Sequence, residues 1–242
     1  MFPIRDHNPS LSVPYVTRLL VILNIVMFIV TSPYGLNREV LWYQLALYPD
    51  AVMQGQRLGG LVTHMFLHAG ILHLAGNLLF LWVFGDNVED QMGHLGFLAF
   101  YFGCGILAAG AQIAMDPSSD IPMVGASGAI AGVMGAYLLF FPRARIDVLA
   151  IIIIFIRIFT VAAWVVLGSW FQLQLFLGLI SDAGAGVAYA AHYGGFVAGL
   201  LMAVPLFLIR GGSGFWRVNH GKPPHRDRAL HQSTVPRVSR RP

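Results

Sequence analysis

Residues 123–137 read MVGASGAIAGVMGAY, and this stretch decides what kind of protein the chain is. Almost all of its residues are small or apolar, yet it carries one hydroxyl, Ser127, between Gly125 and Gly128. Small residues on a membrane helix let a neighbouring backbone approach closely. A serine in such a face is more often a packing residue than a catalytic one, so a chemical role for Ser127 needs support from elsewhere in the sequence.

The composition places the chain in a membrane. Of its 242 residues 57% are apolar and only 11% are charged, which is too apolar for an ordinary soluble domain. The first residues lack the charged start, apolar core and cleavage site of a signal peptide, so we expect the first apolar segment to remain as a span. The single cysteine, Cys104, lies in an apolar run and is interpreted as a packing residue.

Six apolar runs approach the roughly 20 residues that a helix needs to cross a bilayer. They are residues 18–32, 71–88, 94–115, 123–141, a long stretch within 146–180, and 186–209. The fifth run is too long for one span and contains Arg157, which is costly at the bilayer centre. We therefore expect this span to start near Val161 and residues 146–160 to form an interfacial or re-entrant segment. Two spans in this stretch, seven in total, are the alternative.

The predicted fold is thus an all-α membrane protein with six transmembrane helices. Most Lys and Arg residues fall on one side of the six-span arrangement, which predicts that both termini are cytoplasmic. We divide the chain into a cytoplasmic N-terminal segment (1–17), a six-span domain (18–210) and a disordered basic tail (211–242). The tail is rich in Gly, Pro and Arg, which favours attraction to anionic membrane lipid, and no nucleic-acid partner is expected.

Polar side chains occur at a similar shallow depth on three expected spans. The second span is preceded or entered by His64, His68, His73 and Asn77; the fourth carries Ser127 and the sixth His192. Buried polar groups need partners, and their simplest partners are one another. Ser127, Ala131 and Gly135 share one helix face, as do His192, Gly195 and Gly199, so close packing of these faces would bring Ser127 within reach of His192.

This set of groups fits acyl transfer. A serine nucleophile needs a base to take its proton and donors where the oxyanion develops. His73 and Asn77 lie four residues apart on one helix face and both can donate. Interhelical hydrogen bonds that only hold the bundle together are the alternative, and for His64 and His68 we favour it.

Two other kinds of site are not supported. The three histidines His64, His68 and His73 are not followed by the carboxylate of an HExxH motif, so no metal and no cofactor are expected. No carboxylate lies inside an expected span, since Asp116, Asp120 and Asp182 fall in outer loops. A serine–histidine pair without an acid remains.

Three motifs resemble those of the rhomboid intramembrane serine proteases. They are GASG around Ser127, H-x3-H-x4-H-x3-N from His64 to Asn77, and AHYGGFVAG with His192. The resemblance implies a six-helix rhomboid-like bundle with Ser127 as nucleophile and His192 as general base. It further implies that His73, Asn77 and the Ser127 backbone N–H stabilise the oxyanion. Supporting residues would be His68, Gly125, Gly128, Gly195 and Gly199, with a structural role for Glu89.

The chain departs from the family's pattern at two places. Many members carry Trp-Arg before the histidine cluster, where this chain has Gly59 and Gly60 with Arg57 nearby, so the first outer loop is expected to be anchored differently. A tyrosine that stacks on the base in some members is replaced here by Ala131. We therefore expect backbone packing around Gly195 to orient His192.

The function implied is a serine endopeptidase of a bacterial inner membrane that cleaves transmembrane protein substrates. A catalytically inactive rhomboid-like protein that binds transmembrane clients is the first alternative, although the intact Ser127–His192 pair argues against it. A small transporter or channel is the second, and the absence of any expected mid-membrane carboxylate argues against that.

Overall fold

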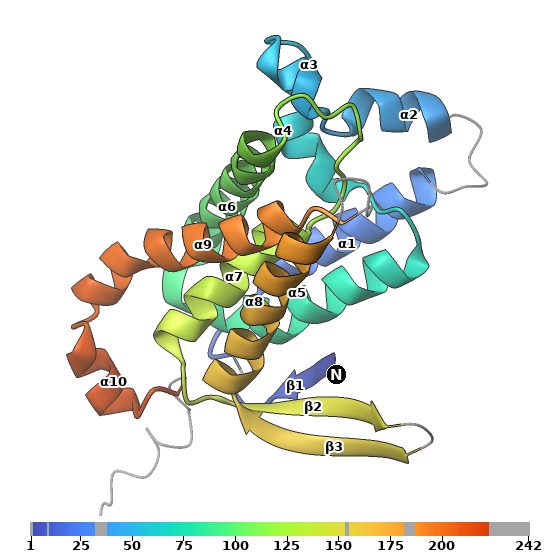
Figure 1. Ribbon diagram of the computed structural model, residues 1–242. Helices are drawn as coiled ribbons and strands as arrows, with labels where there is room; N and C mark the ends of the chain where they lie inside the picture. The colour runs from blue at the N-terminus through green and yellow to red at the C-terminus, as the bar shows by residue number, and fades with distance from the viewer. Residues whose placement is uncertain (1, 9, 32–37, 153–154, 182–186, 223–242) are drawn as a thin grey trace, which may run out of the picture.

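The computed structural model describes residues 2–8, 10–31, 38–152, 155–181 and 187–222, and they fold mostly as helices (Figure 1). In chain order the elements are β1 (Phe2–Asp6), α1 (Tyr15–Val30), α2 (Arg38–Leu45), α3 (Pro49–Met53), α4 (Gly60–Thr63), the 3-10 helix η1 (His64–Phe66), α5 (Ile71–Met92), α6 (His94–Met115), α7 (Ser127–Phe140), β2 (Arg145–Ile152), β3 (Phe155–Ala162), α8 (Ala163–Ile180), α9 (Tyr189–Ile209) and α10 (Ser213–Asn219).

Among the residues that the structure describes, the four helices α5, α6, α8 and α9 are long and apolar enough to cross a membrane. The helices α1, with 16 residues, and α7, with 14 residues, are apolar but shorter. At 1.5 Å per residue α7 is about 21 Å long, less than the roughly 30 Å of a hydrocarbon core. Helix length alone therefore supports four of the six expected spans, and the other two expected runs form these shorter helices.

Helix α7 forms the centre of the bundle. Nearly all of its residues are buried, and it packs against α5, α6, α8 and α9. Its contact with α9 is the most extensive between any two described elements. A Cβ added at Gly195 would overlap the carbonyl oxygen of Gly128, and one at Gly199 would overlap that of Gly132. The two backbones therefore touch along several turns, as glycine-containing interfaces permit.

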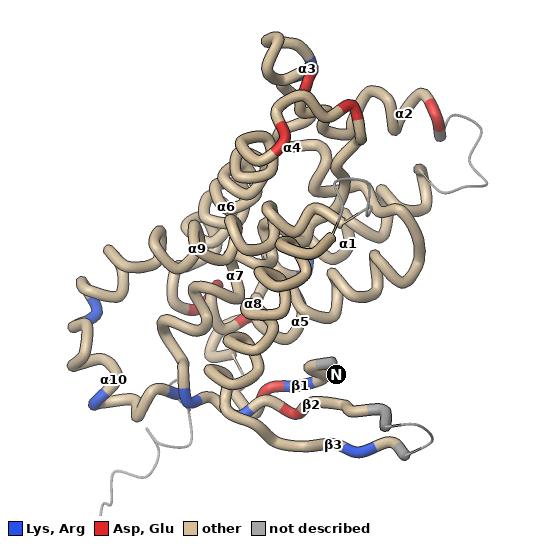
Figure 2. Tube along the Cα trace, viewed as in Figure 1, with Lys and Arg blue, Asp and Glu red and all other residues tan. Residues whose placement is uncertain are grey.

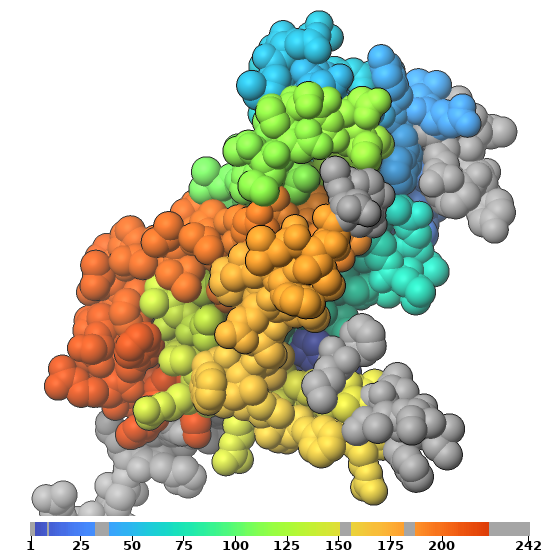
Figure 3. Space-filling model, viewed as in Figure 1, coloured from blue at the N-terminus to red at the C-terminus, as the bar shows by residue number. Residues whose placement is uncertain are grey.

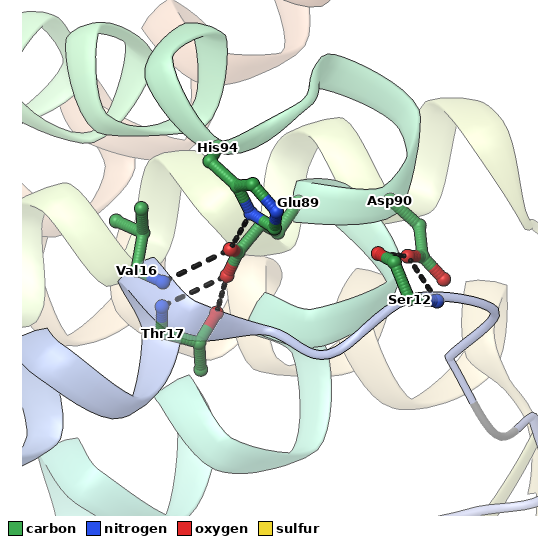
Figure 4. A network of polar contacts seen from close by, with 6 residues as sticks. All are labelled: Ser12, Val16, Thr17, Glu89, Asp90 and His94. Carbon is green, nitrogen blue, oxygen red and sulfur yellow. Dashed lines mark hydrogen bonds and ion pairs between the residues drawn. The ribbon is translucent and has the colours of Figure 1, made fainter.

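The C-terminal end of α5 is tied to the start of α1 by Glu89 (Figure 4). Its buried carboxylate accepts hydrogen bonds from the backbone N–H groups of Val16 (2.9 Å) and Thr17 (2.8 Å) and from the Thr17 hydroxyl (2.7 Å). It also lies 2.6 Å from Nδ1 of His94. An acidic side chain that accepts from the first N–H groups of a helix satisfies donors that the helix leaves open.

Residues 145–162 contain a β-hairpin, which the sequence analysis did not predict. β2 pairs antiparallel with β3 on one edge and with β1 on the other, in the order β1-β2-β3. The expectation of an all-helical chain is wrong for these residues. Ile and Val are strong strand formers, and the hairpin ends at Ala162, one residue before α8 begins, close to the span start expected at Val161.

The beginning of the segment assigned to a disordered tail is helical. Phe215 of α10 is buried and its ring lies 6.1 Å from that of Phe140 and 6.2 Å from that of Phe207. Residues 223–242 of that segment lie outside the described residues. Figure 2 shows Lys and Arg gathered toward the end of the molecule that carries the sheet and α10, whereas Asp and Glu lie both there and on the loops around α2–α4 at the other end.

Candidate active site

The loop before α7 is held by the segments that precede α5. Leu47 and Met123 exchange two backbone hydrogen bonds, of 3.1 and 2.8 Å. The N–H of Gly125 donates to the carbonyl oxygen of His64 at 2.9 Å. The main chain of residues 123–125 thus forms a short ladder against two other segments, which fixes the point where α7 begins.

The segment between α2 and α4 is anchored by Arg57. The guanidinium carbon of Arg57 lies 3.3 Å from the ring centroid of Tyr43 and 5.0 Å from that of Tyr48. A cation over two aromatic faces is a favourable contact. Gly60 packs on the backbone of Ala46, where an added Cβ would lie 2.8 Å from the carbonyl oxygen. Close backbone packing and a cation–π contact therefore do the anchoring.

Ser127 is the first residue of α7 and faces His192 in the first turn of α9. The distance from the Ser127 Oγ to the His192 Nε2 is 2.8 Å, within hydrogen-bond range. No side chain caps the start of α7, so the backbone N–H groups of its first turn have no side-chain partner. A hydroxyl, an imidazole and open N–H donors therefore meet at one helix end.

The other ring nitrogen of His192 also has a side-chain partner. Its Nδ1 lies 2.8 Å from Oε1 of Gln174, which comes from α8. The Trp170 ring, one turn earlier on α8, lies 6.0 Å from the imidazole at an interplanar angle of 38°. The expectation that backbone packing alone orients His192 is therefore wrong. Asp182, one of the three loop acids considered, lies outside the described residues.

Gln174 was missed because a single glutamine in a long apolar run carries no motif. The stretch WFQLQLFLGLI does contain a signal, since polar amides at 172 and 174 interrupt an otherwise apolar span. A polar residue within a membrane helix tends to face a partner in the bundle. Which of the two amides faces inward depends on the packing of α8, and the structure buries Gln174 and exposes Gln172.

A cavity of about 480 Å³ opens beside Ser127 and His192. His73, Asn77 and Gly125 line it, together with apolar side chains that include Phe80 and Met134. The Asn77 side chain donates to the carbonyl oxygen of His73 at 2.9 Å. Gly125 separates the His73 ring from Ser127: a Cβ at this position would lie 2.7 Å from the His73 Nε2 and 3.7 Å from the Ser127 Oγ.

Of the remaining histidines of the motif, His64 lines this cavity and His68 lies next to His73. His64 is buried with Nδ1 2.8 Å from the carbonyl oxygen of Gly60. His68 is buried next to His73, with ring centroids 5.1 Å apart in an edge-on arrangement. Gly128 packs against Ala108 of α6. Across the described ranges, no group of three His, Cys, Asp or Glu side chains is placed so that it could hold a metal ion.

An apolar helical bundle with a half-buried serine–histidine pair beside a cavity defines a class of membrane protein, and comparison with known proteins identifies that class. A family model for the rhomboid domain matches residues 55–209. This range contains the motifs around His64, Ser127 and His192. The chain belongs to the rhomboid family.

Named relatives include proteases. The chain is 39% identical over 127 residues to the rhomboid protease GluP of Bacillus subtilis, which covers 52% of this chain and 24% of that protein. It is 35% identical over 115 residues to the putative rhomboid protease YdcA of the same organism (42% of this chain, 57% of that protein). It is 27% identical over 191 residues to the rhomboid protease GlpG of Salmonella paratyphi A (78% of this chain, 62% of that protein). The matches thus span from about a quarter to less than two thirds of these relatives' lengths.

Proposed function

We propose that the chain is an intramembrane serine endopeptidase that hydrolyses peptide bonds in or near transmembrane segments of other membrane proteins. One observation carries the proposal: the Ser127 hydroxyl lies 2.8 Å from the His192 imidazole, beside a cavity, in a chain of the rhomboid family. The names of the relatives support the same activity.

In the proposed reaction Ser127 is the nucleophile and His192 the general base. The Ser127 Oγ attacks the scissile carbonyl carbon while its proton passes to the His192 Nε2. The tetrahedral oxyanion accepts hydrogen bonds from the Ser127 backbone N–H and from the side chains of His73 and Asn77. The protonated imidazole gives its proton to the leaving amine, and water then attacks the acyl-enzyme by the same route.

Gly125 and the glycines of the α7–α9 contact have supporting roles in this proposal. Gly125 leaves room between His73 and Ser127, so a substrate carbonyl can reach both. Gly128, Gly195 and Gly199 let α9 approach α7 closely enough for His192 to meet Ser127. His68 supports the ring of His73 from the side.

The short central helix agrees with a recessed site. If the inner end of α7 lies at one membrane interface, Ser127 lies about 9 Å below the other, since the helix is about 21 Å long. We propose that the cavity opens to the outer side of a bacterial inner membrane, with both termini cytoplasmic, because Lys and Arg concentrate near the sheet and α10. The basic residues there would contact anionic lipid, and transmembrane proteins would be the substrates.

The first prediction is that Ser127→Ala abolishes cleavage of a transmembrane substrate and labelling by a fluorophosphonate probe. The variant loses the nucleophile but keeps the small-residue packing, so its thermal unfolding in detergent should match that of the parent. Ser169→Ala is the control, because Ser169 is an exposed serine on α8. It should leave cleavage and labelling unchanged.

Two results would contradict the proposal. Cleavage by the Ser127→Ala variant at the parent rate would show that Ser127 is not the nucleophile. A folded parent protein that retains transmembrane clients but neither cleaves them nor reacts with the probe would support the non-catalytic rhomboid-like alternative.

A further inference from the structure

Helix α8 contributes one buried polar group to the site. In α8 the buried residues are Ala163, Leu167 and Gln174, which share one face of the helix, while most others face outward. Figure 3 shows α8 lying along the surface of the bundle. A glutamine side chain on the inward face of such a helix needs a hydrogen-bond partner. Its Oε1 finds that partner 2.8 Å away, at Nδ1 of His192.

We propose that Gln174 is a positioning residue for the base, holding His192 in the tautomer that can accept the Ser127 proton. This inference rests on the proposed protease function and adds a third side chain to the Ser127–His192 pair. The amide oxygen of glutamine can only accept, so Nδ1 must carry the hydrogen. In a neutral imidazole that leaves Nε2 as the acceptor, and Nε2 is the atom facing the Ser127 hydroxyl.

The contact replaces a triad carboxylate with a neutral group. A carboxylate at this position would both fix the tautomer and stabilise the imidazolium through its charge. A carboxamide fixes the tautomer but offers only a dipole. Gln174 therefore orients the base without forming an ion pair in the apolar interior, where an unbalanced charge is costly.

A second contact from α8 limits rotation of the imidazole. The Trp170 ring lies 6.0 Å from that of His192 at an interplanar angle of 38°, and 6.2 Å from that of Phe196 at 32°, so both contacts are tilted. Trp170 precedes Gln174 by four residues, so both side chains project from the same face of α8. Trp170 thus packs beside the imidazole from α8.

The experiment compares three variants of the full-length protein in detergent or liposomes. Gln174→Met keeps the length of the side chain but removes the acceptor, Gln174→Glu restores an acceptor with a charge, and Gln172→Met changes the exposed glutamine two residues away. The readouts are kcat and KM for one transmembrane substrate, pH–rate profiles from about pH 5 to 9, and the thermal unfolding midpoint.

We expect Gln174→Met to lower kcat about tenfold to a hundredfold with little change in KM, because the imidazole then samples the wrong tautomer and orientation. Gln174→Glu should keep most of the parent kcat at high pH. As the pH is lowered, this variant should lose activity at a higher pH than the parent does, because the carboxylate favours the protonated imidazole. Gln172→Met should behave as the parent does. The unfolding midpoints report whether any loss is one of folding.

Gln174 has no positioning role if Gln174→Met keeps the parent kcat and pH profile. If Gln174→Met fails to fold, Gln174→Glu decides: an unshifted pH profile in that variant overturns the inference, because a carboxylate touching the base must move it. A failure of the proposed protease function would be recognised separately, because Ser127→Ala would then still cleave the same substrate.

Discussion

Gly125 is the residue on which the geometry of the site depends most directly. Its φ angle is +123°, a value that residues with side chains rarely adopt. An added Cβ would also lie 2.7 Å from the His73 Nε2, closer than real Cβ contacts allow. The position therefore requires both a positive φ angle and the absence of a Cβ atom, and only glycine meets both requirements.

We predict that Gly125→Ala lowers the rate of substrate cleavage at least tenfold and destabilises the protein by about 1–3 kcal/mol, the usual cost of a strained backbone conformation. The His73 ring would have to move from the place where we propose that it meets the oxyanion. Gly168→Ala on α8 is the control, since a Cβ there meets nothing within 4 Å. Cleavage rates and thermal unfolding measure both effects. Parent-like cleavage by Gly125→Ala would contradict the role given to His73.

Contacts between single residues could be predicted from the sequence where helical spacing and side-chain chemistry agree. Ser127 and His192 could be paired because each lies on a small-residue helix face, and the structure brings them together. The contact between the helices runs through Gly128 and Gly132 as well as Gly135, and Gly132 was not on the expected face. Gln174 could not be found this way, because its partner belongs to another helix and no spacing rule connects them.

Among the elements, α7 and α9 form the most consequential pair. An added Cβ at Gly135 would overlap the carbonyl oxygen of Phe196, just as one at Gly199 would overlap that of Gly132. The obstructing atoms are backbone atoms, which cannot swing aside as a flexible side chain can. Separation of the two helices is the only way to admit a methyl group.

Gly199→Ala should therefore destabilise the protein by about 1–3 kcal/mol and abolish most cleavage, because α9 carries His192 away from Ser127. The matched control is Gly110→Ala on α6, where a Cβ meets nothing within 4 Å and helix propensity favours alanine by about 1 kcal/mol. Thermal unfolding in detergent and substrate cleavage distinguish the two. Equal midpoints for both variants would show that the backbones of α7 and α9 are not in direct contact at Gly199.

The β-sheet is an element that could not be predicted from the local sequence pattern. Residues 146–160 are apolar and β-branched, which fits a strand or part of a membrane segment equally well. These residues form a strand because they pair with β1: Phe2 lies opposite Leu149 and Asp6 opposite Ile146, about 140 positions further along the chain. The helices could be located from their apolar runs, whereas a strand whose partner lies so far away could not.

In the whole molecule, Asp6 joins three parts of the chain. From the end of β1 its carboxylate accepts hydrogen bonds from the Tyr137 hydroxyl of α7 and from the Asn87 side chain of α5, both at 3.0 Å. Burial, and then the nearby charge of Asp86, raise the pKa of Asp6 from 3.8 to about 7. The folded protein thus holds a proton on Asp6 that the unfolded chain releases near pH 4.

Because the folded-state pKa is the higher one, this group stabilises the fold at low pH, and its contribution is lost as pH rises from about 4 through 7. A difference of that size corresponds to at most about 4 kcal/mol, and partial exposure of Asp6 reduces it to about 1–2 kcal/mol. We predict that raising the pH from 5 to 8 lowers the unfolding midpoint of the parent more than that of Asp6→Asn. Asp120→Asn, at an exposed outer-loop acid, should keep the parent's pH dependence. The same pH dependence in Asp6→Asn as in the parent would contradict this assignment.

The backbone contact between α7 and α9 also bears on how the protein could be redesigned. Main-chain atoms set the spacing of Ser127 and His192, whereas the side chains of Leu72 and Phe80 on α5 shape the neighbouring cavity wall. A library that varies those two positions would change which residues the proposed substrate can place there, while leaving the spacing of Ser127 and His192 intact. Selectivity can thus be varied on one helix without disturbing the alignment held between two others.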